Sequence, residues 1–474
     1  MISPKENVDT LVISYKFPPS NDINGIVLAK RIINNNSLVD VLLNKVEDDE
    51  YINFDEIDNY INNRFYTSVD FIRDTVDGIF EFNKQGLEII GNKEYEKIYS
   101  SSWAMSNHFL ALEYKFKHPD VFWTAEFSDP LSRDMNGEFK DYRKLDNKEY
   151  IDKINSKIKE RDSNLKLLEN PSNHFYIVEY LTYIFADKLV FTNFNQKEMM
   201  TELYDENIKE IVENKTEISQ HPTLEKKYYH LVEKECNLNS DDINIAYFGN
   251  FYYVKRHFEA LFYAYESLNH EFKNKIKFHI FINEDDLLKI VIDDLTFKEN
   301  IIIQKPLDYF EFLNATTQFD ILLVNDAITE GGFKVNPYIP SKLSDYRGSG
   351  RNIWSMYENG SQLSKEDAKY KSPVNDFNKT REVLINILKD YGYDDENCSF
   401  NNYYLEKRIT DLNQLIEREF KAKNRSNRKL SNLKRENKKL KKKVEKIENE
   451  KEELISSNSW RITKPLRSIR KIKK

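Results

Sequence analysis

The 474-residue chain has little of several features that would define a protein class. Two cysteines, Cys236 and Cys398, are too few for a disulfide framework or a cysteine-based zinc site, and they favour a reducing, cytosolic compartment. With 12 glycines and 12 prolines, the chain is neither collagen-like nor of low complexity. No apolar run approaches the roughly 18–20 residues that span a bilayer, and the N-terminus lacks the basic leader of a signal peptide. We therefore expect a soluble or peripheral protein.

Several catalytic signatures are also absent from the sequence. The eight histidines are scattered, without an HExxH pair, and no GxSxG elbow, phosphate-binding P-loop or GxGxxG turn occurs. These absences disfavour zinc hydrolases, serine esterases, nucleoside triphosphatases and ordinary dehydrogenases. We expect neither a metal nor a cofactor.

The net charge of −8 hides an asymmetry along the chain. Residues 401–474 hold 24 Lys and Arg against 10 Asp and Glu, about +14, which leaves the first 400 residues at about −22. An acidic body with a basic end is not typical of a nucleic-acid-binding core, so no nucleic acid is expected as a partner. It is typical of a protein whose basic segment binds it electrostatically to an anionic surface.

Short apolar runs alternate with helix-length amphipathic stretches over the first 400 residues. This spacing predicts an α/β protein with parallel sheets built from βαβ units. The runs expected as strands are 10–17, 39–46, 120–127, 187–193, 244–251, 277–283, 300–306, 320–326 and 352–357.

The pattern pauses between about 195 and 242, where the chain is highly charged. We place a boundary there and predict two doubly wound domains, 1–235 and 236–400, whose strands present their carboxyl ends to a shared cleft. The alternative is one large domain with a long insertion.

The apolar period changes to a heptad pattern in residues 401–455, which predicts a coiled coil and a homo-oligomer. A solvated helix that never dimerises is the alternative. The final segment, residues 456–474, holds Trp460, and its last 15 residues carry seven Lys or Arg and no acid. We call it the basic tail and predict that it binds an anionic membrane surface; a disordered tail that aids solubility is the alternative.

Two clusters in the first domain are candidates for binding or chemistry. Residues 17–31, directly after the first strand, contain Gly25 and Arg31 at a helix start, a natural phosphate or sugar site, or else a structural turn. Asp129 follows the strand at 120–127 and could accept hydrogen bonds from sugar hydroxyls, or cap a helix. His108 could reach the same cleft, although a lone histidine is more often structural.

Two further clusters lie in the second domain. In residues 247–261, Gly249 ends a buried strand, and Lys255 and Arg256 sit at a helix start that would favour a diphosphate, or else form a basic pair on the surface. In residues 336–350, Ser341 begins a helix on which Lys342 and Asp345 share one face. Lys342 could meet a phosphate and Asp345 a ribose hydroxyl, or the two could form a plain ion pair.

Six motifs in order carry a resemblance to a known family. FPP…GIVLAKR, WTAEFSDP, ADKLVFTN, QHPTL, YFGNFY…R and PYIPSKLSDYRGSG resemble the family-four glycosyltransferases of bacteria and archaea, which have the GT-B fold. The similarity is to a subgroup associated with cell-surface polysaccharides, and NSWRITKPLR in the basic tail resembles a motif of surface-glycan assembly enzymes. AEFSDP and PSKLSDY are the most specific of these motifs.

The resemblance implies two Rossmann-like domains, with the acceptor bound by the first and a nucleotide-sugar by the second. Lys342, with Lys255 or Arg256, would hold the donor diphosphate, Asp345 would contact the ribose, and Gly25 would lie near the phosphates. Transfer to a glycan or lipid-linked acceptor would retain anomeric configuration without a metal, at the cytoplasmic face of the membrane. The first loop keeps one glycine of the family's usual pair, and Asp345 alone stands for a Glu-x7-Glu motif.

Two other functions are compatible with these motifs. A catalytically inactive GT-B subunit could scaffold a glycan-assembly complex, as the altered first loop suggests. A GT-B sugar epimerase would also bind a nucleotide-sugar, but its soluble substrates fit a membrane-binding tail less well.

Overall fold

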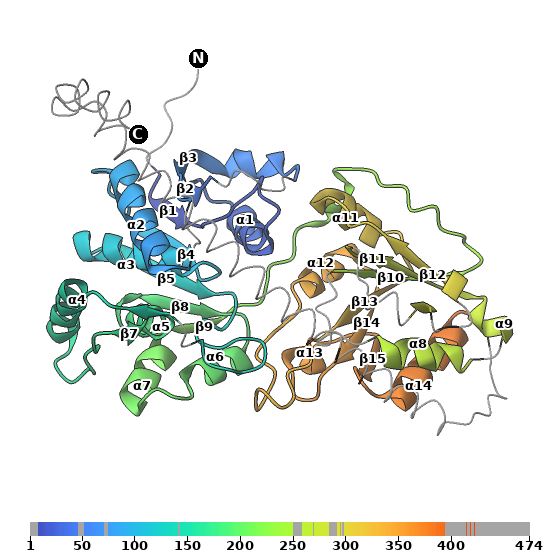
Figure 1. Cartoon of the computed structure of the whole chain (residues 1–474). Coiled ribbons are helices and arrows are strands. Elements are labelled where there is room, and N and C mark those ends of the chain that lie inside the picture. The colour runs from blue at the N-terminus through green and yellow to red at the C-terminus, as the bar shows by residue number, and fades with distance from the viewer. Residues whose placement is uncertain are drawn as a thin grey trace, which may run out of the picture. The chain divides into compact units, whose positions relative to one another are not determined.

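The structure, a computed structural model, describes residues 8–393 apart from 46–51, 71–73, 141–142, 250–257, 269, 284–291, 294 and 296–297, together with Gln414, Arg418 and Lys421 (Figure 1). It contains two parallel sheets with helices packed against them. Both sheets belong to one compact unit, residues Met1–Ile409. No described helix is both long and apolar enough to cross a bilayer.

The first sheet has seven parallel strands in the order β3-β2-β1-β4-β5-β8-β9. Its order reverses at β1, which pairs with β2 on one side and β4 on the other. The strands are β1 (Thr10–Ile13), β2 (Val39–Asn44), β3 (Ile61–Thr67), β4 (Lys97–Ser101), β5 (Phe122–Phe127), β8 (Lys188–Phe191) and β9 (Thr216–Ile218).

Helices and one small hairpin, β6 (Lys144–Leu145) with β7 (Ser172–Asn173), accompany this sheet. One hydrophobic cluster joins the sheet to α2, α3, α5 and α7, and another joins it to α1. The helical elements are α1 (Ile23–Asn35), η1 (Asp55–Tyr60), α2 (Val76–Ile90), α3 (Met105–Lys117), α4 (Lys148–Arg161), α5 (His174–Phe185), α6 (Phe194–Thr201), α7 (Glu206–Lys215) and η2 (Lys226–His230).

The second sheet has six parallel strands in the order β12-β11-β10-β13-β14-β15 and reverses at β10. Its strands are β10 (Ile243–Phe248), β11 (Ile276–Phe281), β12 (Ile301–Gln304), β13 (Ile321–Asn325), β14 (Asn352–Tyr357) and β15 (Tyr370–Pro373). The helical elements around it are α8 (Glu259–Glu266), α9 (His270–Lys273), η4 (Lys298–Asn300), α11 (Tyr309–Thr316), α12 (Lys342–Ser349), α13 (Gln362–Lys365) and α14 (Phe377–Asp390).

All nine predicted strand regions contain a strand, and four strands of the two sheets were not predicted: β3, β4, β9 and β15. Three of these four lie at sheet edges, where one neighbour is missing and polar residues are tolerated. β4 is central but contains buried serines. The Ser100 hydroxyl lies 2.8 Å from both His108 Nδ1 and Trp123 Nε1, so its polar group is satisfied inside the core.

The two sheets share a hydrophobic cluster, in addition to the core that each sheet buries. Phe54, from the first half, packs against Tyr309 and Phe310 of α11, with ring centroids 5.3 and 4.8 Å apart. The same cluster contains Val12 of β1 and Phe248 of β10. The segment between β9 and β10 therefore connects two halves in direct apolar contact.

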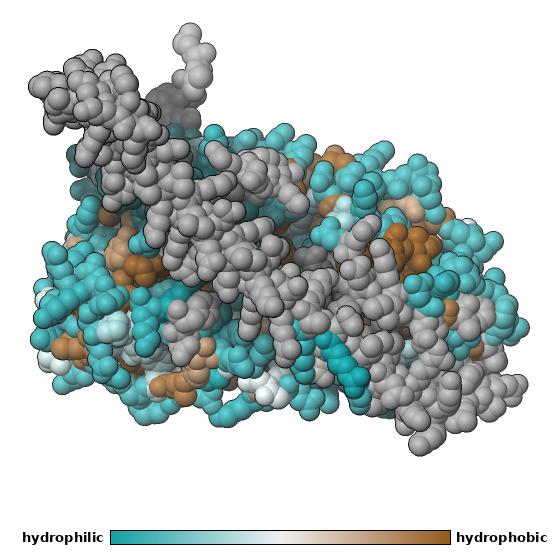
Figure 2. Space-filling model, in the orientation of Figure 1, coloured by the Kyte–Doolittle hydropathy of each residue, from teal (hydrophilic) through white to brown (hydrophobic). Residues whose placement is uncertain are grey.

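The structure has two separate sheets, each with its own order reversal, as the prediction of two doubly wound domains requires. The exact limits 1–235 and 236–400 stay predictions. The coiled coil predicted for 401–455, except for Gln414, Arg418 and Lys421, and the basic tail lie outside the described residues. On the face shown in Figure 2, hydrophilic residues cover most of the coloured surface, and hydrophobic residues occur in separate groups.

Candidate active site

A cavity of about 620 Å³ lies between the two halves. It is lined by segments that follow strands at their carboxyl ends, where parallel α/β sheets bind ligands. Residues 21–24 come after β1, Trp103 after β4, Ser128 to Asp134 after β5, and Asp326 and Ala327 after β13. Lys140, His221 and Ser341 also line it.

Asp129 faces this cavity, as the sequence predicted. Its side chain is exposed on the cavity side. The protein around the cavity reduces the hydration of the carboxylate, which raises the pKa of this carboxyl to about 6. The positive charge of Lys140 opposes this shift. No described residue donates a hydrogen bond to Asp129, which leaves the carboxylate available to a ligand.

Tyr338 also lines this cavity. Burial and the negative charges of Asp129 and Asp134 raise the pKa of its phenol above the ordinary value. The hydroxyl therefore stays protonated at neutral pH and can donate a hydrogen bond.

His108 does not reach the cavity, which corrects the sequence prediction. It lies on α3 inside the core of the first half, fully buried, with its ring edge-on to Trp123 and Phe127. Burial lowers the pKa of its imidazole to about 3, so the side chain is neutral. Its position explains the error: the loop before α3 lines the cavity through Trp103, but the helix turns His108 inward.

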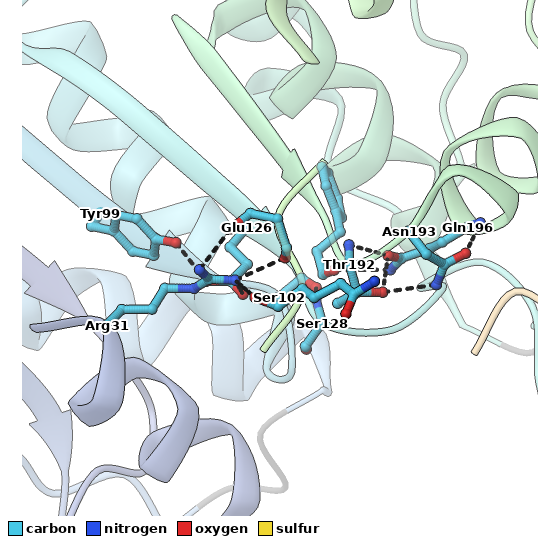
Figure 3. A network of polar contacts seen from close by, with 11 residues as sticks. Arg31, Tyr99, Ser102, Glu126, Ser128, Thr192, Asn193 and Gln196 are labelled. Carbon is cyan, nitrogen blue, oxygen red and sulfur yellow. Dashed lines mark hydrogen bonds and ion pairs between the residues drawn. The ribbon is translucent and has the colours of Figure 1, made fainter. Parts of the chain in front are cut away.

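Arg31 was predicted to bind phosphate, but it binds Glu126 of β5 instead (Figure 3). Two guanidinium nitrogens donate to the two carboxylate oxygens at 2.9 and 2.8 Å, and further bonds reach Ser219 and the Gln220 carbonyl. Tyr99 donates to the same carboxylate. Although burial opposes the charge, the nearby Glu126 raises the pKa of Arg31 above its ordinary range. Arg31 thus links α1 by hydrogen bonds to β5 and to Ser219 and Gln220, in the segment that follows β9.

Gly25 lies in the first turn of α1 and contacts the protein's own backbone. A Cβ atom there would stand 2.8 Å from the Lys16 carbonyl oxygen and 2.9 Å from the Phe17 Cα. Asp22 caps this turn by accepting from the backbone N–H of Gly25 at 3.0 Å. The close approach predicted at Gly25 exists, but its partner is the preceding segment rather than a phosphate.

Helix α12 begins where the sequence predicted, with Ser341 at its N-cap position. Lys342 lies with its ammonium 4.8 Å from the centroid of the Phe312 ring. Asp345 is buried, and its carboxylate accepts from Lys30 of α1 at 2.8 Å and from Tyr309 at 3.0 Å. The ionic partner that the structure gives Asp345 is therefore in the other half of the molecule.

Further contacts hold α12 against the first half. Lys30 also donates to the Ser344 hydroxyl at 2.9 Å, and Thr223 donates to the Ser344 carbonyl at 2.8 Å. Asn193, after β8, donates to the Pro337 carbonyl at 2.9 Å in the loop that precedes α12. These hydrogen bonds join the two halves of the molecule.

The third predicted cluster is described only in part. Gly249 follows β10 with φ of 152°, which glycine adopts most easily, and its N–H donates to the Phe281 carbonyl at 3.2 Å. Lys255 and Arg256 lie outside the described residues. The choice between them as a diphosphate ligand stays open.

The structure adds residues that sequence reasoning did not place at the site. Lys30 lies within the cluster at residues 17–31, but its buried ion pair could not be foreseen because Asp345 lies 315 residues away. Asp326 directly follows the buried strand β13, and a carboxylate at the carboxyl end of a strand could have been recognised from the sequence as a candidate. His221 belongs to the QHPTL motif, and burial beside Lys30 and Arg31 lowers the pKa of its imidazole to about 3.

Comparisons with known proteins support the fold. No protein-family model matches the chain, and no curated protein matches its sequence. Among solved structures, HepE of Anabaena in complex with UDP-glucose is 10% identical, with a TM-score of 0.50, over 87% of this chain and 99% of its own. A trehalose-6-phosphate structure from E. coli with UDP-2-fluoro glucose is 11% identical, with a TM-score of 0.48, over 85% and 99%. Two Rossmann-like halves in this arrangement show that the chain has the GT-B fold.

Proposed function

We propose that this protein is a glycosyltransferase that moves a sugar from a nucleotide-sugar to a hydroxyl group of a glycan or lipid-linked acceptor. The observation that carries the proposal is the cavity of about 620 Å³ at the carboxyl ends of both sheets, with Asp129 on one wall and the start of α12 on the other. In the GT-B fold, HepE holds UDP-glucose, which supports a nucleotide-sugar as the donor class.

The donor would bind on the side of the second sheet. The N-terminus of α12 presents the positive end of its helix dipole to a diphosphate, with Ser341 and Lys342 beside it. Gly249, after the central strand β10, would let a ligand approach the backbone closely. Fixed cations and helix dipoles of this kind can stabilise a leaving diphosphate without a metal.

The acceptor would bind on the side of the first sheet, where Asp129 accepts a hydrogen bond from the reacting hydroxyl. In the retaining reaction that we propose, the bond between the anomeric carbon and the diphosphate oxygen breaks as the acceptor oxygen bonds to that carbon on the same face. The hydroxyl proton passes to the departing diphosphate. Asp129 then orients the acceptor, which is a large part of the catalytic effect.

One observation favours a second candidate, a catalytically inactive GT-B subunit. Asp345, expected at the ribose, is already paired with Lys30, and Arg31 is paired with Glu126. A cleft held by such contacts suits a scaffold as well as an enzyme in a closed state.

A thermal-shift screen of nucleotides and nucleotide-sugars separates the two candidates. An enzyme should be stabilised by about 2.7 kcal/mol at a ligand concentration 100 times its dissociation constant. Lys342→Ala should weaken this binding, whereas Lys334→Ala, an exposed lysine paired with Glu202, should leave it unchanged. A folded sample that responds to no nucleotide would favour the scaffold.

Incubation with UDP-GlcNAc alone tests the epimerase alternative. An epimerase forms its product without an acceptor, whereas a transferase does not. Formation of an epimer would contradict the proposed transfer.

A further inference from the structure

The carboxylates that line the cavity differ in the hydrogen bonds that they accept from the protein. Asp22 accepts from backbone N–H groups at the start of α1, Asp134 accepts from the N–H groups of Asn136 and Glu138, and Asp326 accepts from the Glu358 N–H. Asp129 alone of these four accepts no hydrogen bond from a described residue. A ligand can therefore reach one carboxylate whose hydrogen-bonding capacity is unused.

The basic side chains that line the cavity differ in whether their positive charge is paired within the protein. Arg133 lies 3.6 Å from Glu202, stacks on the Phe139 ring at 4.3 Å and donates to the Gly137 carbonyl. His221 is neutral because its pKa is lowered. Neither offers an uncompensated positive charge to a ligand.

Lys140 is the exception within the described part of the chain. Its ammonium lies 5.3 Å from the centroid of the Phe175 ring and forms no ion pair with a described carboxylate. Burial lowers the pKa of Lys140, while Asp129, Asp74, Glu179 and Asp134 act at longer range in the opposite direction. These carboxylates act on the ammonium without contacting it, so its N–H donors stay available to an anionic group of a ligand that enters the cavity.

Lys140 and Asp129 face the same cavity and interact through their charges, yet they do not form an ion pair. Their separation leaves a cation and a carboxylate that can each bind a different group of one molecule. A neutral sugar would use only the carboxylate. A sugar with an acidic substituent would use both.

We propose that Lys140 is a specificity-determining residue that binds an anionic group of the acceptor, a carboxylate or a phosphate, while Asp129 binds an acceptor hydroxyl. The inference rests on the proposed function, because it takes the wall formed by these two residues as the acceptor side. It narrows the acceptor to an acidic sugar or a sugar phosphate.

Ligand-observed NMR titrations of the full-length protein test this inference. The nucleotide found in the thermal-shift screen is kept saturating, so that the donor site is filled. The probes are glucose, glucuronate and glucose 6-phosphate. At least one anionic sugar should bind about tenfold or more tightly than glucose, and this preference should weaken as salt is added. The stronger of the two anions identifies a carboxylate or a phosphate as the recognised group.

Variants separate a binding role of Lys140 from a structural one. Lys140→Gln should reduce anionic-sugar affinity to that of glucose without changing glucose affinity, and Lys140→Arg should keep the preference. Lys144→Gln, at an exposed lysine of β6 outside the cavity lining, is the matched control and should behave like the wild type.

Three results would overturn the inference: equal affinity for the three sugars, a preference that survives in Lys140→Gln, or no binding of any of them. Failure of nucleotide binding is a different result. It would remove the proposed function, and the same titrations without nucleotide would still show whether Lys140 selects an anion.

Discussion

At the residue scale, two neighbours on α1 show how similar side chains acquire their roles from their surroundings. Lys30 and Arg31 are adjacent basic residues after the first strand, where a phosphate site was expected. Lys30 is buried against Asp345 and Arg31 is held by Glu126. Both cations are neutralised within the protein, so α1 joins parts of the structure rather than offering charge to a ligand.

Lys30→Met should destabilise the protein strongly. It leaves the Asp345 carboxylate buried without its cation, which typically costs about 3–5 kcal/mol. Urea unfolding measures the loss. Lys97→Met, which removes an exposed ion pair with Asp9, is the control and should change stability little. Equal, small losses in both variants would show that the ion pair with Asp345 does not form in solution.

Glu179 should make stability depend on pH. Burial raises the pKa of its carboxyl to about 7, against hydrogen bonds that lower it, whereas the unfolded chain titrates near 4.3. The folded state therefore holds the proton to a higher pH. The contribution of Glu179 is complete below about pH 4 and is lost as the pH rises through about 7.

Comparing the wild type with Glu179→Gln isolates this effect. The amide keeps an acceptor for the Ser132 N–H, which donates to Glu179 at 2.8 Å, but it does not ionise. Between pH 4.5 and 7, the unfolding free energy of the wild type should fall relative to that of the variant, by on the order of 3 kcal/mol. Parallel pH profiles of the two proteins in urea unfolding would contradict the prediction. Glu149→Gln, at an exposed position, should follow the wild type.

At the scale of elements, the two short segments that open helices α1 and α12 both line the cavity. The α1 segment follows β1, where the order of the first sheet reverses, and the α12 segment follows β13, which pairs with the central strand β10. The α1 segment depends on Gly25, because its helix lies against the backbone of Lys16 and Phe17. The position of this helix in turn places Lys30 beside α12.

Gly25→Ala should therefore displace the start of α1. The added Cβ has no room beside the Lys16 carbonyl, and overpacking of this kind usually costs about 1–3 kcal/mol. Gly331→Ala is a useful comparison, because its Cβ would meet nothing within 4 Å and only its positive φ of 83° is unfavourable. A Gly25→Ala protein with wild-type stability and nucleotide binding would show that the contact is not restrictive.

At the scale of the whole molecule, the described body and the basic end of the chain are expected to act separately. The body holds the candidate site, and the basic tail holds the residues predicted to bind a membrane. The predicted homo-oligomer and the predicted location at the cytoplasmic membrane face both depend on residues 401–474, most of which lie outside the described part of the chain.

Deletion of residues 456–474 should abolish co-sedimentation with anionic liposomes. Each basic residue near an anionic leaflet contributes about 1 kcal/mol, and the last 15 residues carry seven. Nucleotide binding should be unchanged, which serves as the internal control. Co-sedimentation that survives the deletion would place the membrane contact elsewhere.

The sequence alone determined the fold class, most of the strands and the position of Asp129. Buried parallel strands can be recognised from the local sequence as short apolar runs, and a polar residue after such a run indicates the carboxyl end of a strand. It did not reveal β4, whose buried Ser100 hydroxyl is satisfied by His108 and Trp123, because that hydrogen bonding depends on partners from other elements.

Only the tertiary structure decided which charged residues are available to a ligand. Lys30, Arg31, Asp345 and Lys140 are all charged residues in the sequence, and nothing local distinguishes them. Packing gives partners to the first three and leaves Lys140 at the cavity without an ion pair to a described carboxylate. The energy of a buried charge depends on what lies within a few ångströms of it, and those neighbours are brought together by the fold rather than by the chain.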